Sequence, residues 1–519
     1  MDKVVYYAEE ALKGKLFVSS AIGFVKDSDD FWNDKLDDKT YQVYIHSLLI
    51  LRYFTFAYRE TNKEVYIDKA KEYLNRYLSR KDKSKYSWHE QSVAGRLNNI
   101  LHFTGEYYKS EPKPKELNDY LKTHISFLLN DDNYKKNNHG IMMDSALASS
   151  LRLLNDDLLK FKKPIVEKVI VRAREAILRD FSEKGLHLEN SPDYHRLTVK
   201  WLLALERKLN VEEATLGDEY VNKLKESEKL DAIIATPNNR YPIMGDSSDG
   251  QYKGEKSFDN FIDKTAGRAI FHNKKIRSQL TFIAGYGSKG HKHYDDLSFI
   301  FHDGKQAVFN DSGKYNYDKS SRLRNHVISP MAHNSLAIYK ENYTISHKDE
   351  IKKKIYIARE EQKESYNLVQ GYNKSYGKNI VLKRTLVFFE DNSILIYDKF
   401  KAEKPITAAV NFNLGIDVLT EKVAKGEFLI KGENNYFLKS HIGKFTSVQL
   451  DDTNFNPCII SNRFNTVEKN NRILFRQKTS KGAFLTTIVP ESSELKIIKI
   501  REDQVTVSYR NQEMVIDLG

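Results

Sequence analysis

The stretch GHKHYDDLSFIFHDGKQAVFNDSG, residues 290–313, combines a strand pattern with a cluster of potential ligand side chains. Short β-branched and aromatic runs flank Asp303-Gly304, a pair typical of a tight hairpin turn, which predicts two antiparallel strands. His291 and His293 lie two positions apart, so on an extended segment both imidazoles point to the same face. This stretch therefore predicts a β structure that carries a functional site.

Nitrogen and oxygen donors recur downstream of the two histidines. Asp311 follows the second predicted strand, and His333 comes later in the stretch PMAHNSL, residues 330–336. Three such ligands delivered by separate strands are what a zinc-type divalent ion requires. The pattern indicates a site but does not identify the reaction, and each histidine taken singly also fits a buried or surface imidazole.

The two halves of the chain have different periodicities. Apolar residues recur at helical spacing up to about residue 230, with the clearest stretches at residues 40–60, 116–131, 143–161, 164–181 and 196–209. From about residue 266 the period changes to two, with short strands between turns, as in antiparallel β-sandwiches. The Gly-, Ser- and Asp-rich stretch 245–260 separates the halves. We therefore expect an α-helical domain at 1–255 and an antiparallel β-sandwich domain at 256–519.

The composition bears on the compartment of the protein. Cys458 is the single cysteine, which excludes an intramolecular disulfide. The N-terminus lacks the basic and apolar regions of a signal peptide, and no run of about 18 apolar residues occurs. We expect no membrane span, and a cytoplasmic protein if Met1 is the native start, or a periplasmic or secreted one if a signal has been removed.

The chain is basic, with 83 Lys and Arg against 71 Asp and Glu and a net charge of +12. A basic surface attracts polyanions such as nucleic acid, anionic lipid or acidic polysaccharide. The lysines are scattered evenly, so a lysine-rich composition without functional meaning explains the charge equally well. Because no nucleic-acid-binding motif accompanies the charge, we expect no nucleic-acid partner.

Two loops of the helical half carry side chains that suit proton transfer. Asn138 and His139 belong to the motif NNHG, in which an amide can bind a carboxylate and an imidazole can accept a proton. Tyr194 follows the helix-entry signal Ser191-Pro192 and offers a phenol. A turn with an asparagine in the left-handed conformation and His139 as a cap or solvated side chain is the more common interpretation of NNHG. A helix start with a packed Tyr194 is the alternative for the second loop.

A third segment suits sugar binding. SWHEQSVAGRLNNI, residues 87–100, places Trp88, His89 and Arg96 near a helix start. An aromatic ring and an arginine suit a sugar ring and a carboxylate, respectively. A core tryptophan and a surface ion pair of the arginine are the more common interpretation.

Taken in order, these segments resemble the heparinase II/III-like polysaccharide lyases and the related alginate-lyase families. The matching elements are SWHEQSVAGRLNNI, NNHG, SPDYH, GHKHYDDLSF, the DSG at 311–313 and RLRNHVISPMAHNSL, which span roughly residues 87–336. The resemblance implies an N-terminal (α/α) toroid followed by a C-terminal antiparallel β-sandwich. It also implies β-elimination on uronic-acid-containing acidic polysaccharides or oligosaccharides.

The resemblance implies catalytic roles as well. Asn138 would neutralise the uronate carboxylate, which stabilises the enolate formed at C5 as an oxyanion hole does. Either His139 or Tyr194 would remove the C5 proton, depending on whether that proton is syn or anti to the leaving group. Tyr194 would also protonate the departing glycosidic oxygen. By the same resemblance His291 faces the sugar.

The remaining implied residues bind substrate or a metal. The substrate-binding set is Trp88, His89 and Arg96, with Tyr315 as a weaker correspondence. A structural divalent ion, expected to be zinc, would lie on His293, Asp311 and His333.

Two other functions remain open from the sequence. A glycoside hydrolase on the same architecture would need two carboxylates, for which Glu189 and Asp193 are the best candidates. A noncatalytic protein that binds acidic glycans is the other alternative, although a binding module has no need for the full set of Asn, His and Tyr side chains.

Overall fold

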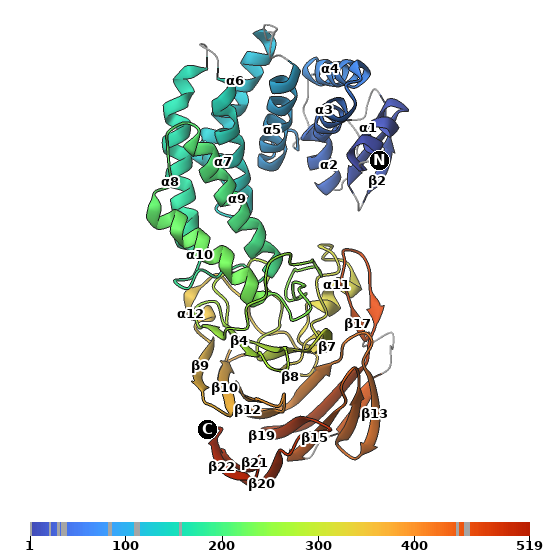
Figure 1. The fold of residues 1–519 in the computed structure, drawn as a ribbon, viewed down its shortest axis with the longest axis vertical. Helices are drawn as coiled ribbons and strands as arrows, with labels where there is room; N and C mark the ends of the chain where they lie inside the picture. The colour runs from blue at the N-terminus through green and yellow to red at the C-terminus, as the bar shows by residue number, and fades with distance from the viewer. Residues whose placement is uncertain are drawn as a thin grey trace. The chain divides into compact units, whose positions relative to one another are not determined.

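The computed structural model describes residues 3–19, 22–28, 32, 39–80, 86–107, 115–154, 158–442, 446–450 and 457–519. The chain divides into two compact units. The helical unit consists of Met1–Arg179 and Thr198–Leu224, and the β unit consists of Asp180–Leu197 and Lys225–Gly519. The predicted fold class, a helical N-terminal region followed by a C-terminal antiparallel β region, is confirmed (Figure 1).

The N-terminal region contains a short hairpin and a series of helices. The hairpin is β1(Lys15–Ser19) and β2(Gly23–Lys26), and the helices are α1(Lys3–Leu12), α2(Lys39–His46), α3(Leu49–Thr61), α4(Glu64–Leu78), α5(Glu90–Tyr107), α6(Lys115–Leu129), α7(Asn138–Ser150), α8(Lys162–Asp180), α9(Pro192–Asn210) and α10(Asp218–Ile234). The boundary between the units falls within α9 and α10, so the first turn of α9 belongs to the β unit.

The stretch 40–60 forms two helices rather than the single continuous helical pattern of its sequence. The break lies at Leu48, a buried residue in the left-handed conformation with φ 53°. The carbonyl of His46 accepts a hydrogen bond from Arg96, and the carbonyl of Ser47 accepts one from Asn99. Side chains of α5 therefore satisfy the carbonyl groups that the end of α2 leaves free.

The β unit contains a five-stranded and a ten-stranded antiparallel sheet. The five-stranded sheet has the order β3-β4-β5-β6-β7, formed by β3(Phe261–Asp263), β4(Arg268–Asn273), β5(Ser278–Ile283), β6(Ser298–Asp303) and β7(Gln306–Phe309). The ten-stranded sheet has the order β13-β14-β15-β19-β12-β11-β10-β9, with β8 beside β12 and β16 beside β19. Its strands are β8(Leu336–Ile338), β9(Ile355–Gln362), β10(Tyr366–Asn373), β11(Val381–Phe389), β12(Ile394–Asn413), β13(Leu419–Ala424), β14(Glu427–Lys431), β15(Tyr436–Ile442), β16(Thr446–Leu450) and β19(Arg472–Pro490).

Smaller elements complete the β unit. A three-stranded sheet has the order β20-β21-β22, and β17 pairs with β18. Their bounds are β17(Ile459–Ile460), β18(Glu468–Lys469), β20(Lys496–Arg501), β21(Gln504–Tyr509) and β22(Gln512–Asp517), and two short helices are α11(Arg322–Val327) and α12(Asp349–Lys352).

The sheets pack as layers because successive side chains of the central strands point to opposite faces. In β12, Ile394 and Ile396 belong to a core shared with the five-stranded sheet, whereas Leu395 and Tyr397 belong to a core shared with the three-stranded sheet. The first core includes Phe299 of β6 from the opposing sheet. This arrangement is a β-sandwich with an added third layer.

The hairpin predicted in residues 290–313 forms, with two differences from the expected geometry. Asp303 pairs with Gln306, so the turn residues are Gly304 and Lys305, one position later than predicted, and Gly304 takes the positive φ of 55°. His291 and His293 lie in the loop before β6 rather than on an extended strand. The prediction of a strand there is wrong because His291 is in the left-handed conformation, with φ 54°, and turns the chain.

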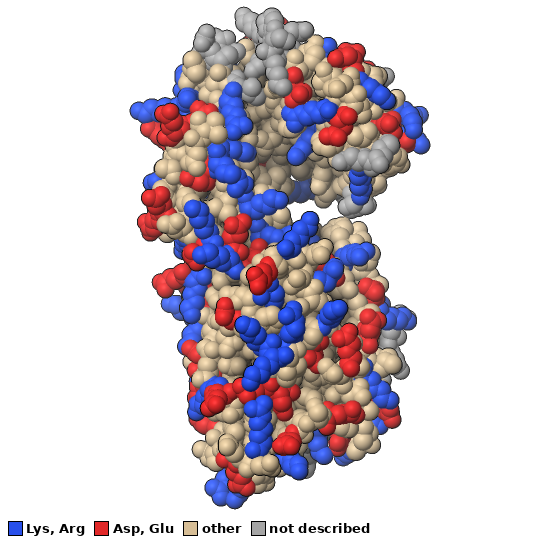
Figure 2. Space-filling view, viewed as in Figure 1, with Lys and Arg blue, Asp and Glu red and all other residues tan. Residues whose placement is uncertain are grey.

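The surface seen in Figure 2 carries Lys and Arg side chains interspersed with Asp and Glu rather than one continuous basic area. The net charge of +12 therefore does not gather in a single patch on this face. Among the described residues, no helix combines the length and apolar character needed to cross a membrane.

Candidate functional site

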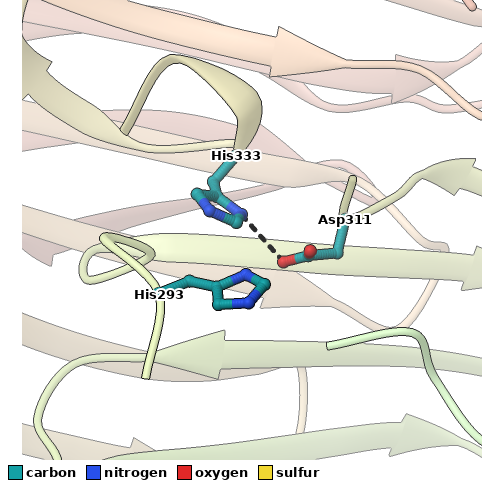
Figure 3. A group of neighbouring side chains, drawn as sticks. All are labelled: His293, Asp311 and His333. Atoms are coloured by element: carbon teal, nitrogen blue, oxygen red, sulfur yellow. Dashed lines mark hydrogen bonds and ion pairs between the residues drawn. The ribbon is translucent and has the colours of Figure 1, made fainter. Parts of the chain in front are cut away.

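Three buried side chains that are far apart in the sequence converge in the β unit. His293 precedes β6, Asp311 follows β7, and His333 precedes β8 (Figure 3). One potential ligand atom from each lies within 4.8 Å of the other two, and His333 Nδ1 is 2.9 Å from Asp311 Oδ2. The sandwich thus brings together the three residues that the sequence singled out as potential metal ligands.

The chemistry of this cluster fits a divalent ion. His293 Nδ1 and His333 Nε2 are buried, and neither has a hydrogen-bond partner in the described part of the chain. A buried polar atom without a partner is costly, so such atoms call for a ligand or an ion. Two imidazoles and a carboxylate are donors that zinc accepts.

Tyr194 and His291 form the second group of predicted residues in the β unit. Tyr194 lies in the first turn of α9, and its ring stacks on the imidazole of His291 with 3.4 Å between centroids and 18° between planes. Its hydroxyl is 3.2 Å from the hydroxyl of Tyr317. Burial raises the pKa of Tyr194 above its ordinary value, which keeps the phenol protonated at neutral pH.

Asp246 links the stacked pair to the three-residue cluster. Its carboxylate accepts hydrogen bonds from His291 Nδ1 at 3.0 Å, His293 Nε2 at 2.9 Å and Arg324 Nη1 at 2.6 Å. Although burial acts to raise the pKa of Asp246, these hydrogen bonds and nearby charges hold it well below its ordinary value. In the sequence, Asp246 and Asp249 lie in the stretch YPIMGDSSDG, which fits an acidic site but is more typical of a linker between domains.

Several backbone positions around these side chains are in the left-handed conformation. His291, Asn190 and Tyr315 have φ values of 54°, 59° and 57°. Asn190 Nδ2 donates hydrogen bonds to the carbonyls of Ser288 and Gly290, at 2.7 and 2.9 Å, so it joins the loop before Tyr194 to the loop that carries His291. Strained residues of this kind cluster at functional sites, where surrounding contacts hold them.

Tyr315, which the resemblance implies for substrate binding, has different surroundings from its neighbour Tyr317. The amide of Tyr315 donates a hydrogen bond to Ser461 Oγ, and its phenol has no ring or hydrogen-bond contact with Tyr194 or His291 among the described residues. Tyr317 contacts both, since its ring centroid is also 6.4 Å from that of His291. The sequence did not single out Tyr317, because its position relative to Tyr194 depends on tertiary structure.

In the helical unit, the NNHG motif forms the start of α7. Asn137 caps the helix by accepting a hydrogen bond from the amide of His139 at 2.9 Å. The partly exposed Asn138 side chain makes no hydrogen bond within the part of the chain that the structure describes. Its amide is therefore available to a ligand.

His139 is held by a carboxylate that the sequence did not single out. His139 Nδ1 is 2.9 Å from Glu90 Oε1, and His89 Nε2 is 3.5 Å from the same oxygen. Burial acts to raise the pKa of Glu90, but its contact with His139 and other interactions lower it to about 2. The structure thus groups His89 with His139 around an ionised glutamate.

Trp88 and Arg96 have different surroundings. Trp88 is 40% exposed, which leaves its ring accessible. Arg96 is 1% exposed and donates hydrogen bonds to His124 Nε2, to the Tyr77 hydroxyl and to the carbonyls of His46 and Ser87. Arg96 therefore holds the segment before Trp88 in place, and its guanidinium group is engaged within the protein.

Sequence families and solved structures agree with this architecture. The heparinase II/III N-terminus model matches residues 7–271, and the heparinase II/III-like C-terminal model matches residues 264–506. Together the two models span a helical region followed by antiparallel sheets, and both describe a polysaccharide-lyase family. The chain belongs to the heparinase II/III-like family of polysaccharide lyases. No curated protein sequence gives a significant match.

The solved structures that resemble the chain cover nearly all of it. A crystal structure of heparinase III has a TM-score of 0.81 at 17% identity and covers 99% of this chain and 91% of its own. Heparan sulfate lyase HepC from Pedobacter heparinus has a TM-score of 0.73 at 16% identity, over 100% of this chain and 89% of its own. At these identities the likeness establishes the fold.

Proposed function

We propose that this protein cleaves a uronic-acid-containing acidic glycan by β-elimination, with Tyr194 as the general acid. The observation that carries the proposal is the stack of Tyr194 on His291, whose Nδ1 is anchored by Asp246. A protonated phenol beside an oriented imidazole can donate a proton to the departing glycosidic oxygen. Family membership supports the reaction class.

Asn138 and His139 supply the remaining chemistry of the proposal. The Asn138 amide donates to the uronate carboxylate, which reduces its negative charge and stabilises the enolate that forms when the C5 proton leaves. The C5 proton goes to His139 or Tyr194, according to which side of the sugar presents it. Glu90 supports this role because its carboxylate holds His139 Nδ1 and leaves Nε2 for the substrate.

Hydrolysis has less support from the carboxylates of this region. Asp193 is buried, and its two oxygens accept hydrogen bonds from the Ser248 amide at 2.9 Å and from Arg196 at 3.3 Å. A glycosidase needs two carboxyl groups that both reach the scissile bond. Asp193 is engaged in local structure instead, so the pair of Glu189 and Asp193 does not meet this requirement.

The assay of the proposal uses a panel of uronic-acid glycans with heparan sulfate and heparin first, because the solved relatives include heparan sulfate lyases. Chondroitin, hyaluronan and alginate, each as polymer and oligomer, complete the panel. β-Elimination gives an unsaturated uronate that absorbs in the ultraviolet, and we expect this signal with at least one substrate. New reducing ends without that absorbance would indicate hydrolysis, and binding without any product would support a glycan-binding protein.

The proposal includes a structural divalent ion, zinc first, held by His293, Asp311 and His333. The bound ion would supply positive charge that fixes the ligand-bearing loops. At free zinc about 1,000-fold above Kd, an ion that binds only the folded state stabilises it by about 4 kcal/mol. We therefore expect a chelator to lower the Tm and His333→Ala to abolish zinc retention.

His347→Ala is the matched control, because His347 is exposed and outside the cluster. Zinc content by atomic emission and Tm by calorimetry give the two readouts. Equal Tm values for zinc-loaded and chelated protein, or zinc retained by the His333 variant, would contradict a metal at this cluster.

A further inference from the structure

We propose that Asp246 is a positioning residue. Its single carboxylate orients the imidazole of His291 and also prepares His293 to bind the metal ion. This inference rests on the proposed function of His291 and on the proposed metal at the His293 cluster. Its physical basis is that one buried carboxylate bonds both imidazoles, through different oxygen atoms.

The two carboxylate oxygens have separate partners. Oδ1 accepts from His293 Nε2 and from Arg324 Nη1, at 2.9 and 2.6 Å, whereas Oδ2 accepts from His291 Nδ1 at 3.0 Å. The Asp246 side chain is 3% exposed, so water does not compete for these bonds. Charge-assisted hydrogen bonds of this kind are directional as well as strong.

For His293 the consequence is a fixed tautomer. A proton on Nε2 points at Asp246, so Nδ1 carries the lone pair, and Nδ1 is one of the two buried atoms without a partner in the described chain. A carboxylate that receives the second N–H of a metal-ligating histidine orients the ring and strengthens the ligand. Asp246 therefore prepares His293 to bind through Nδ1.

For His291 the same carboxylate fixes the proton on Nδ1, whereas for His293 it fixes the proton on Nε2. A proton on Nδ1 is directed to Asp246, which leaves Nε2 at the other side of the ring, where the Glu189 carboxylate is 3.6 Å away. The Tyr194 ring covers one face of the imidazole. These contacts also hold His291 in its left-handed backbone conformation, with φ 54°.

Arg324 fixes the orientation that an asparagine amide would take at position 246. It donates to Oδ1, and the same Nη1 donates to the Lys314 carbonyl at 2.7 Å. In Asp246→Asn, the amide oxygen stays with the two donors Arg324 and His293, and the NH2 group turns to His291. His291 Nδ1 must then accept, so its proton moves to Nε2. The substitution reverses the His291 tautomer while it preserves the contact to His293.

The experiment compares Asp246→Asn with Asp246→Ala in the full chain. For the Asn variant we expect zinc affinity within a few-fold of wild type and kcat lowered by up to about 10⁴-fold, the size of effect that a reversed histidine tautomer produces in a serine protease triad. For the Ala variant we expect the same loss of kcat and, in addition, a zinc Kd raised by about 10–100-fold. Zinc affinity is measured by competition with a chromophoric chelator, without any glycan.

A spectroscopic readout tests the tautomers directly. In protein labelled with ¹⁵N-histidine, long-range ¹H–¹⁵N spectra should place the His291 proton on Nδ1 in wild type and on Nε2 in the Asn variant. Asp249→Asn is the matched control, since it makes the same change in the same segment, where Asp249 pairs with Arg240. The control should keep wild-type spectra, zinc affinity and kcat.

The two variants test the positioning of His291 and the preparation of His293 separately. Wild-type kcat and an unchanged His291 tautomer in Asp246→Asn would overturn the positioning of His291. Wild-type zinc affinity in Asp246→Ala would overturn the link to His293. If wild-type protein eliminates no uronate, the proposed function fails, whereas the zinc and tautomer measurements still decide whether Asp246 orients the two imidazoles.

Discussion

Replacing Tyr194 by phenylalanine is expected to lower kcat for uronate elimination by about 10²–10⁴-fold, the range that a positioned general acid or base contributes. The variant loses one hydroxyl, whose only hydrogen bond in the described structure joins it to Tyr317 at 3.2 Å. The aromatic stack on His291 remains. We therefore expect the Tm and the circular dichroism spectrum of wild type, because a partly exposed hydrogen bond is worth about 1 kcal/mol.

A substrate with a leaving group that needs no proton separates the two roles proposed for Tyr194. In a uronate with fluorine at C4, the fluoride ion leaves without help from a general acid. If Tyr194 acts only as the acid, Tyr194→Phe should therefore recover activity on this substrate. If Tyr194 also removes the C5 proton, activity stays low on both substrates, and the base is not His139.

Tyr317→Phe is the comparison variant, because it removes the hydroxyl that faces Tyr194 while it leaves Tyr194 intact. We expect a loss of kcat below about 10-fold, the scale of one neutral hydrogen bond. Tyr194→Phe with wild-type kcat on a natural glycan would remove Tyr194 from the mechanism.

Local sequence patterns predicted the β hairpin and the division into halves because those features depend on neighbours in the chain. Alternation around Gly304 fixes which side chains of β6 and β7 enter the core, and helical spacing does the same for α8 and α9. The convergence of His293, Asp311 and His333 was also accessible, since each flanks a strand of the same region.

The role of Asp246 was not accessible from local pattern. Its partners His291, His293 and Arg324 lie 45, 47 and 78 positions away, and its own surroundings read as a linker. The position of Arg96 was equally inaccessible. Its spacing on a helix does not tell whether the arginine is exposed to solvent or donates to the free carbonyls at the end of α2. Both residues are defined by what folding places opposite them.

Replacement of Arg384 by methionine is expected to lower the free energy of unfolding of the β unit by about 3–5 kcal/mol, because it leaves a buried charge without its partner. Arg384 of β11 and Asp398 of β12 are fully buried, face each other across the strand pair and form two parallel hydrogen bonds of 2.7 and 2.8 Å. Burial raises the pKa of Asp398 in spite of the arginine. Urea denaturation followed by the β-sheet circular dichroism signal measures the loss.

The same substitution should weaken zinc binding at the proposed site, because Arg384 also holds the loops that carry His293 and His333. Its Nη1 donates to the carbonyls of Leu297 and Asn334, at 2.6 and 2.5 Å, and Asn334 directly follows His333. Adding Asp398→Leu to the variant removes the unpaired carboxylate and should restore part of the stability, but it does not restore those two hydrogen bonds. Zinc affinity should therefore stay reduced in the double variant, whereas a purely electrostatic role of Arg384 requires both properties to recover together.

Lys399→Met is the control for the loss of an ion pair on the neighbouring position of β12. Lys399 pairs with Asp503 at 2.7 Å, and both side chains are about one-third exposed, at 34% and 35%. Because exposed pairs contribute about 0–1 kcal/mol, the control should unfold near the wild-type urea midpoint and retain zinc. An equal loss of stability in both single variants would mean that burial does not set the strength of the Arg384 pair. Unchanged zinc affinity in Arg384→Met would show that Arg384 does not support the proposed site at His293, Asp311 and His333.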